Sequence, residues 1–435
     1  MKVALIYPDV YEVARYQYSR KEIPPFGVMY IASVLEQLNN EVMIINVCFH
    51  DTAKDLQEYD IVGYSIPSSV SYDIIKESIA KSKIKEDALV IIGGVHPSIY
   101  PEETLLDLKP HVLCIGEGEK TIVEILEHYL DRDFSKVKGV CLLRDGKPFR
   151  TPLRKLITNI DSLPLPARHL LPQETFIMND RLLSDRKIKL THVMFARGCP
   201  FHCHFCASTQ KIMQYRSGGS ARKELIHLKE RYGIEGFSTI DDNSIINKKV
   251  FLDLCKNITD LGMKWKTLSR VDQVNRKVLH VMKDSGCVEI QFGVESGSQR
   301  ILTAMNKGIT KKNIYQAVKI AYDIGLNVKI FLVHGYPGEN LQTTSETMDL
   351  LNKIAYMVSR VNLFRFVPLP GSYAYENAYK FNIQGTHRHP DWEGTWGKFH
   401  IYHNKRQWWG DKRDFEEMNR AYSILDYYIN STFSM

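Results

Sequence analysis

The sequence lacks a long hydrophobic run. No stretch of its 435 residues approaches the ~20 consecutive apolar residues that cross a bilayer, so we expect no transmembrane helix. Residues 1–8 form a short apolar run with one lysine, which is typical of a buried strand and not of a secretory signal peptide. We therefore expect a protein that is neither secreted nor held in a membrane.

A strong charge of one sign and a disulfide pattern are absent as well. The 57 basic and 50 acidic residues leave a net charge of +7 without long runs, which is too mild to indicate a nucleic-acid partner. Three of the eight cysteines share one short segment, which favours a metal-binding motif in a reducing cytoplasm over a disulfide framework. The composition, 44% hydrophobic and 25% charged, is that of ordinary soluble proteins, and the length suits two or three domains.

One short loop carries the strongest signal that is present. Cys199, Cys203 and Cys206 stand at the spacing C-x3-C-x2-C, after the strand-like run 190–195. Three thiolates from one loop suit a soft iron–sulfur cluster better than an oxygen-preferring cation. A [4Fe-4S] cluster is ordinarily held by four cysteines, so three leave one iron open to a ligand other than protein.

The alternative for this loop is a structural zinc site with His202 or His204 as the fourth ligand. Closed zinc sites usually combine two ligand pairs, and no second pair follows downstream. The spacing, with Phe205 just before the last cysteine, resembles the signature of the radical S-adenosylmethionine (SAM) family. That resemblance implies a [4Fe-4S] cluster on the three cysteines, SAM bound to the open iron through its amino and carboxylate groups, and Phe205 near the adenine.

Short apolar runs alternate with helical patterns over residues 1–150, which predicts a doubly wound, Rossmann-like parallel sheet. The expected strands are 3–8, 42–47, 61–65, 89–93 and 111–115, and the expected helices are 26–38, 72–82, 102–108 and 119–130. Such sheets bind ligands beyond the carboxyl ends of their strands. No G-x-G-x-x-G fingerprint follows the first strand, which disfavours NAD.

Small and polar residues follow three of these strands. They are Ser65 and Ser68, then Gly93, Gly94 and His96, then Gly116, Glu117 and Gly118. Each alone is most simply a turn or a helix cap. Together they resemble, over residues 3–130, the cobalamin-binding domain of cobalamin-dependent radical SAM enzymes, and the stretch Pro24-Pro25-Phe26-Gly27 adds to the match. The resemblance implies that these residues line cobalamin.

Two points qualify the cobalamin site. His96 either faces the cofactor, which we favour, or bonds backbone within a turn. The D-x-H-x-x-G motif, by which many cobalamin proteins supply an axial histidine to cobalt, is absent. The resemblance is therefore compatible with cobalamin held without a protein ligand to cobalt.

Residues 151–188 contain four scattered prolines and few periodic runs, which indicates an extended linker. Over residues 189–370, strand and helix patterns alternate again and predict a partial (β/α)6 barrel of the TIM type. The strand candidates are 190–195, 236–240, 264–268, 289–293, 327–333 and 360–367. Active sites of such barrels lie at the carboxyl ends of the strands.

Polar residues recur at these strand ends. Asp241, Asp242 and Asn243 follow the second strand, Arg270 the third, Glu295 and Ser296 the fourth, and Gly335 the fifth. The first three offer acceptors to the SAM amino group, and an arginine suits its carboxylate. Each alone is weak, because the Asp-Asp-Asn run also fits a helix cap and the arginine a surface ion pair. All four segments resemble the SAM-contacting segments of the family, which assigns Glu295 and Ser296 to the ribose and Gly335 to the adenosine.

Residues 371–435 are rich in aromatic side chains, and 414–429 predict an amphipathic helix with Asp414 as its cap. They predict a small, mostly helical C-terminal cap. The aromatic residues either cover a substrate or pack the cap onto the barrel, and for most of them we favour packing.

As a cobalamin-dependent radical SAM enzyme, the protein is expected to cleave SAM reductively to a 5'-deoxyadenosyl radical. It would then methylate an unactivated carbon, or phosphorus, of a small molecule or peptide through methylcobalamin, with flavodoxin or ferredoxin as electron donor. One alternative within the family is a cyclase, ring-contraction or rearrangement enzyme without methyl transfer. A remote alternative is a zinc-stabilised, non-enzymatic binding module. A methylthiotransferase is disfavoured, because Cys48, Cys114 and Cys141 are too widely spaced for the second cluster of those enzymes.

Overall fold

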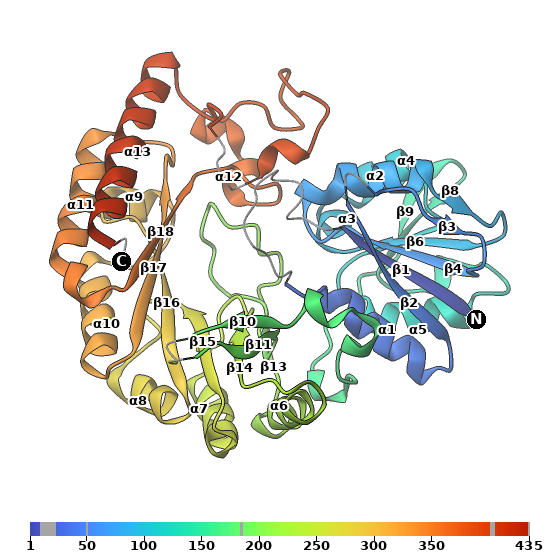
Figure 1. The fold of residues 1–435 in the computed structure, drawn as a ribbon. Helices are drawn as coiled ribbons and strands as arrows, with labels where there is room; N and C mark the ends of the chain where they lie inside the picture. Colours follow the sequence, from blue (N-terminus) through green and yellow to red (C-terminus); the bar gives the residue numbers. More distant parts are fainter. Residues whose placement is uncertain (9–22, 49–50, 183–185, 401–404, 434–435) are drawn as a thin grey trace. The chain divides into compact units, whose positions relative to one another are not determined.

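The computed structural model describes residues 1–8, 23–48, 51–182, 186–400 and 405–433 (Figure 1). The chain forms two compact units, Met1–Phe176 with Thr395–His400, and Ile177–Gly394 with Ile401–Met435. Each unit has its own large sheet and its own buried core.

The first unit is built on a sheet in the strand order β2-β1-β4-β6-β7-β8-β9. The parallel strands are β2 (Glu41–Val47), β1 (Lys2–Pro8), β4 (Ile61–Ser65), β6 (Leu89–Gly93) and β7 (Val112–Cys114). The strands β8 (Val140–Arg144) and β9 (Lys147–Arg150) add an antiparallel hairpin at one edge. The doubly wound sheet expected from the sequence is confirmed. Its central strands β1, β4, β6 and β7 are largely buried on both faces, whereas the edge strand β2 is partly exposed.

Helices cover both faces of this sheet (Figure 1). α1 (Phe26–Gln37) and α5 (Glu119–Glu127) lie on one face, and α2 (Tyr72–Lys81) and α4 (Pro101–Leu108) lie on the other. Ile6 and Val62 pack with Ile74 and Ile75 of α2 in one buried cluster. The short helix α3 (Val95–Ile99) directly follows β6 and so starts at the ligand-binding edge of the sheet.

A short segment of the C-terminal region, Thr395–His400, packs into the first unit. The Trp396 ring stacks on Tyr100 with ring centroids 5.3 Å apart, and Phe399 is fully buried. The Asp73 carboxylate accepts two hydrogen bonds from the segment, at 2.7 and 3.0 Å. The core of the first unit is therefore completed by residues far from it in sequence.

The second unit is a partial barrel. β10 (Met178–Asp180) pairs antiparallel with β11 (Ile188–Val193), and five strands then continue the sheet in parallel. They are β14 (Gly236–Thr239), β15 (Lys264–Ser269), β16 (Cys287–Glu295), β17 (Asn327–His334) and β18 (Arg360–Arg365). These six parallel strands from β11 to β18 confirm the expected partial (β/α)6 barrel.

Helices lie along one side of the barrel sheet (Figure 1). They are α6 (Gly218–Tyr232), α7 (Lys248–Ile258), α8 (Arg276–Asp284), α9 (Gln299–Ala304), α10 (Lys311–Asp323) and α11 (Leu341–Ile354). Asn247, Asn275, Thr310 and Asn340 cap four of them, since each side chain accepts a backbone N–H from the first turn.

The two faces of the barrel sheet differ in burial. Along β17, buried and half-buried side chains alternate strictly. The buried set, on the side of the helices, is Val328, Ile330, Leu332 and His334, and the half-buried set is Asn327, Lys329, Phe331 and Val333. Because successive strand residues point to opposite faces, the half-buried set marks the inner face of the barrel, which is less covered.

The last helix, α13 (Lys412–Phe433), starts earlier than the sequence indicated. Asp414 lies inside its first turn, where its carboxylate accepts the Asp411 N–H at 2.9 Å, so the prediction of Asp414 as the cap is wrong. Met418 and Leu425 are buried, and α13 packs against α11 and β18 on the outer face. The packing interpretation holds for this helix.

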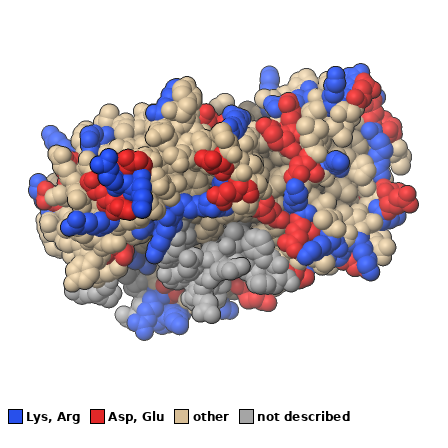
Figure 2. All heavy atoms as spheres, turned by 90° about the horizontal axis from the view of Figure 1, so that it is seen from above, with Lys and Arg blue, Asp and Glu red and all other residues tan. Residues whose placement is uncertain are grey.

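None of the described helices combines the length and the apolar character that crossing a bilayer requires. On the face drawn in Figure 2, basic and acidic side chains are interspersed.

Candidate active site

The thiol loop is held at both ends. β12 (Ala196–Arg197) pairs with β13 (Gln214–Tyr215), and the Cys199 N–H donates to the Gln210 carbonyl at 2.9 Å. Gly198 has φ +88°, and a Cβ there would lie 2.6 Å from the Ile212 carbonyl oxygen, so only glycine fits. The loop therefore starts from a fixed and tightly packed turn.

The three cysteines of the loop are unbonded and partly exposed. Burial raises the pKa of the Cys199 and Cys206 thiols, and repulsion from the neighbouring Cys203 adds to it. Such thiols are neutral until a metal binds, and they lose their protons when they become its ligands. This chemistry fits an iron–sulfur cluster.

The zinc alternative finds no support in the described residues. The His204 ring stacks on Tyr373 at 4.2 Å, and its Nδ1 lies 3.1 Å from the Ala304 carbonyl oxygen, so this ring already has partners within the chain. Across the part of the chain that the structure describes, no three histidine, cysteine or acidic side chains converge as a single metal ion needs. A four-iron cube keeps its cysteine ligands on separate corners and does not need such convergence.

Arg270 lies against this loop. Its guanidinium stacks over the Phe201 ring at 3.7 Å, and Nη1 donates to the Cys203 sulfur at 3.6 Å. Two of its nitrogens bind the Asp272 carboxylate at 3.0 Å each, and Nη2 also donates to the Lys307 carbonyl at 2.6 Å. The carboxylate that Arg270 holds at two points is thus Asp272, and its contact with the SAM carboxylate stays a prediction.

A buried ion pair lies at the carboxyl end of β16. Lys307 Nζ donates to Glu295 Oε1 at 2.7 Å, with both side chains less than a tenth exposed. Glu295 has φ +67°, and the pair covers Gly293, whose added Cβ would lie 2.6 Å from Glu295 Oε1. The ammonium of Lys307 also lies 5.7 Å from the centre of the Phe205 ring. The pair therefore adjoins the residue assigned to the adenine.

Lys307 was missed in the sequence. It stands in the turn after α9, in the run Met-Asn-Lys-Gly, where nothing in the sequence distinguishes it from a solvated surface lysine. Only the fold brings it beside Glu295.

Asp241 is engaged by its own chain. Its carboxylate accepts the N–H groups of Phe195 and Ala196 at 2.8 and 3.0 Å and the Ser244 hydroxyl at 2.6 Å. Burial raises the pKa of Asp241 to about 6, against the effect of these hydrogen bonds. Asp241 thereby fixes the start of the thiol loop to β14.

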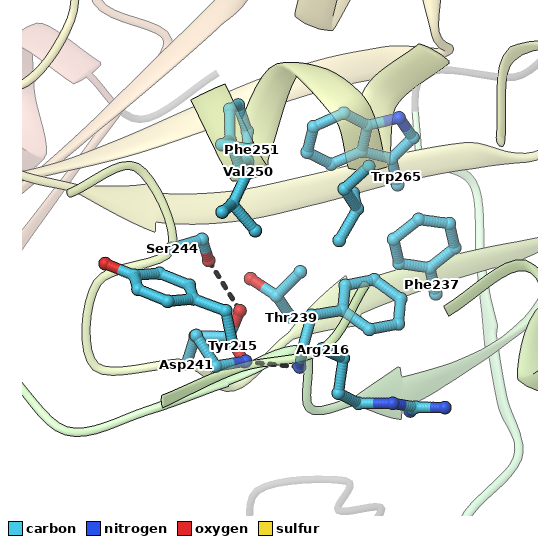
Figure 3. Close-up of a pocket in the computed structure, with 12 residues that line it drawn as sticks. Tyr215, Arg216, Phe237, Thr239, Asp241, Ser244, Val250, Phe251 and Trp265 are labelled. Atoms are coloured by element: carbon cyan, nitrogen blue, oxygen red, sulfur yellow. Dashed lines mark hydrogen bonds between the residues drawn. The ribbon is translucent and has the colours of Figure 1, made fainter. Parts of the chain in front are cut away.

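Asp241 also lines a pocket on the outer side of the sheet (Figure 3). The pocket lies between β14, β15 and α7, and Phe237, Phe251 and Trp265 form much of its wall. Because the wall is apolar and faces the helices, this pocket is separate from the inner face.

The other polar residues of the strand ends differ in their surroundings. Asp242 accepts the hydroxyl of Ser208, just past the last cysteine, at 2.9 Å. The Nδ2 of Asn243 is buried without a hydrogen-bond partner among the described residues, as expected of a group that awaits a ligand acceptor. The contacts of Asp242 and Asn243 with SAM stay predictions.

Ser296 and Gly335 are tied into the packing of the barrel. The Ser296 hydroxyl accepts the Ser298 N–H at 3.1 Å and is fully buried. Gly335 has φ +94°, and a Cβ there would lie 2.8 Å from the sulfur of Met418 in α13. Its glycine is explained by the last helix, and its role toward adenosine stays a prediction.

In the first unit, glycines open the edge where β4, β6 and β7 end. Gly94 has φ +116°, and a Cβ would lie 2.5 Å from the Ile66 carbonyl oxygen, so the turn requires glycine. Gly116 has nothing within 4 Å of an added Cβ, and the neighbouring Val95 is 41% exposed. Ser65, Ser68 and Gly93 are half-buried at the same edge. This low, partly apolar surface fits a large planar ligand.

Three of the expected cobalamin residues have contacts within the chain. The His96 ring is buried, with Nδ1 2.8 Å from the Ser69 hydroxyl and its plane edge-on to Trp396 at 4.8 Å. Glu117 accepts the Ile157 N–H at 2.7 Å, and an added Cβ on Gly118 would lie 2.9 Å from a side chain of α1. His96 lies behind the edge, among aromatic rings, and its contact with the cofactor stays a prediction.

Two family models match the chain. The B12 binding domain matches residues 17–126, and the Radical SAM superfamily matches residues 193–351. Fold, thiol loop and glycine edge thus define a radical SAM enzyme with an N-terminal B12 binding domain. An uncharacterized methyltransferase of Pyrococcus horikoshii is 32% identical over 398 residues, which cover 88% of this chain and 84% of that protein. The chain belongs to the family of cobalamin-dependent radical SAM enzymes.

More distant relatives cover most of the chain. A cytidylyl-2-hydroxyethylphosphonate methyltransferase of Streptomyces wedmorensis is 26% identical, over 80% of this chain and 76% of its own. An anaerobic magnesium-protoporphyrin IX monomethyl ester cyclase of Rubrivivax gelatinosus is 25% identical, over 80% of this chain and 65% of that protein. The solved structure of the methyltransferase TsrM from Kitasatospora setae, with cobalamin and a [4Fe-4S] cluster bound, has a TM-score of 0.71 at 14% identity. The match covers 98% of this chain and 89% of TsrM. That likeness shows the fold. The cofactors of the family are a [4Fe-4S] cluster, SAM and cobalamin.

Proposed function

We propose that the protein methylates an unactivated carbon, or a phosphorus atom, of a small molecule. The observation that carries this proposal is the pairing, in one chain, of a three-thiol loop with an open glycine edge of the B12 type. Three of the proteins named above are methyltransferases, and one of them acts on a phosphonate, which supports transfer of a methyl group.

When bound, the cluster, SAM and cobalamin supply one-electron chemistry and a methyl carrier. The chain supplies positioning. Cys199, Cys203 and Cys206 hold the cluster and leave one site open, Arg270 braces the loop, and the Lys307–Glu295 pair offers opposite charges beside the adenine. An electron donor of the flavodoxin or ferredoxin type would deliver electrons to the partly exposed loop.

The test is anaerobic reconstitution with iron, sulfide and cobalamin, followed by SAM with a deuterated methyl group and a reductant. We expect 5'-deoxyadenosine and a cobalamin that gains the deuterated methyl. Cys203→Ala should lose both, whereas Cys48→Ala, a half-buried cysteine of the first unit, should keep both. Retained SAM cleavage in Cys203→Ala would refute the cluster assignment.

The cyclase relative supports a second candidate, a rearrangement or ring closure without methyl transfer. It predicts 5'-deoxyadenosine together with cobalamin that binds but never gains the deuterated methyl. That result would replace the methyltransferase proposal.

A further inference from the structure

The inner face of the barrel sheet carries a group of basic side chains below the SAM-binding end. Lys266 of β15, Lys329 of β17 and Arg360 of β18 lie on this face together with the carboxylate of Glu289 from β16. The strand register sets them side by side, because Lys266 pairs with Glu289 and Lys329 pairs with Arg360. We name these four residues the basic floor.

Positive charge exceeds negative charge at the basic floor. Arg360 reaches Glu289 at 3.4 Å, and Lys266 reaches Asp180 of β10 at 3.7 Å, so both ion pairs are long. Within the described part of the chain, no carboxylate lies within 4.0 Å of the Lys329 ammonium. Three basic groups thus share two carboxylates, and the excess charge falls on Lys329.

The Lys329 side chain leans toward the SAM-binding end. Its Nζ lies 4.7 Å from the centre of the Phe331 ring, two residues further along β17. Phe331 stacks on Phe364 of β18, and Val333 packs into the apolar cluster that includes Phe205. Along the inner face of β17, the Lys329 ammonium is therefore followed by the Phe331 ring and then by Val333, which adjoins the cluster that Phe205 contacts.

A half-buried ammonium without a carboxylate is costly to keep charged. Burial and, to a smaller extent, the neighbouring charges of Arg360 and Lys266 lower the pKa of Lys329 to about 8, against the opposite effect of Glu289. A group kept at such a cost is a candidate for binding, because an incoming anion removes the cost. If Lys329 had only a structural role, an apolar side chain at this position would stabilise the fold more.

We propose that the basic floor binds an oxyanion of the substrate, a carboxylate, phosphate or phosphonate, with Lys329 as its principal contact. The proposal rests on the proposed function only in assigning that anion to the substrate. Lys329 and Val333 are four residues apart, which is about 13 Å along a strand at ~3.3 Å per residue. The substrate would therefore carry its anionic group on the order of 10 Å from the end of β17 that adjoins Phe205, with an apolar part between them.

Protection from acylation tests the contact without catalysis. The reconstituted protein is treated with a water-soluble acetylating reagent at pH 7.5 in chloride or inorganic phosphate of equal ionic strength, and the acetylation rate of each lysine is measured by peptide mass spectrometry. We expect phosphate to slow the acetylation of Lys329 severalfold, with an effect that saturates. The acetylation rate of Lys319, an exposed lysine of α10, should not change. An equal rate for Lys329 in both salts, or equal protection of Lys319, would overturn the proposal.

Variants test the same contact by equilibrium dialysis with radiolabelled phosphate. Lys329→Met should weaken phosphate binding at least tenfold, Lys329→Arg should keep it within about threefold of the wild type, and Lys319→Met should not change it. If Lys329→Met does not fold, the acylation result on the wild type still decides. Because phosphate binding needs no SAM, wild type that cleaves SAM but binds no phosphate refutes only this inference, and the reverse outcome refutes only the proposed function.

Discussion

Breaking the buried ion pair at the end of β16 should destabilise the barrel far more than breaking an exposed one. In Lys307→Met, the Glu295 carboxylate would keep its burial, at under a tenth exposed, and lose its 2.7 Å partner. Removing one partner of a buried pair typically costs about 3–5 kcal/mol, because a buried charge is left without compensation. We expect a loss of roughly 3 kcal/mol in the free energy of unfolding.

The measurement is urea denaturation of the full chain, followed by circular dichroism. The matched control is Lys319→Met, which breaks the exposed pair with Asp323 at 3.0 Å and should cost far less, because solvent screens the charges of an exposed pair. The double variant Lys307→Met with Glu295→Gln should recover part of the loss, since the unpaired charge is gone. If Lys307→Met costs no more than Lys319→Met, the pair is not buried as described.

Four other changes have defined outcomes. Cys203→Ser should lower bound iron in the reconstituted protein, measured by colorimetric iron assay; unchanged iron would contradict ligation by this thiol. Gly94→Ala should weaken cobalamin binding in spectral titrations, because its Cβ would lie 2.5 Å from a carbonyl oxygen, whereas Gly146→Ala, also at positive φ but in open space, should not. Phosphate affinity should fall as pH rises through about 8, because the Lys329 ammonium that binds the anion loses its proton there; constant affinity from pH 7 to 9 would exclude this lysine. Phe399→Ala should destabilise the first unit by roughly 3 kcal/mol, seen as faster hydrogen exchange in β1 and β4, because a fully buried ring is lost.

Much of the first unit was predictable because its central strands are short apolar runs. The bounds of β4 and β6 agree with the prediction, since both are short, buried and ended by small residues. The start of α13 was missed, because Asp411 and Asp414 both resemble caps and only the backbone geometry separates them. The local sequence predicts which residues form a helix or strand, but it predicts the first and last residues of that element less accurately.

For the candidate site, the positions were predictable and the directions of side chains were not. Asp241 and Arg270 do stand at strand ends, but Asp241 turns to the outer pocket and Arg270 binds Asp272. Those directions depend on partners elsewhere in the fold, the start of the thiol loop for Asp241 and the Asp272 carboxylate and Lys307 carbonyl for Arg270, which no spacing reveals. The basic floor was likewise hidden, because its members are separated by helices in sequence and meet only through the register of four strands.

The return of Thr395–His400 to the first unit limits how this protein can be divided. A shortened chain that stops at the end of the first sheet would lack Trp396 and Phe399, and would expose the aromatic surface that these rings cover. If the N-terminal half were exchanged for that of a relative, residues 395–400 of this chain would have to pack on the sheet and helices of the other protein. The two halves are therefore expected to change together in evolution, and engineered chimeras should carry residues 395–400 with the sheet on which they pack.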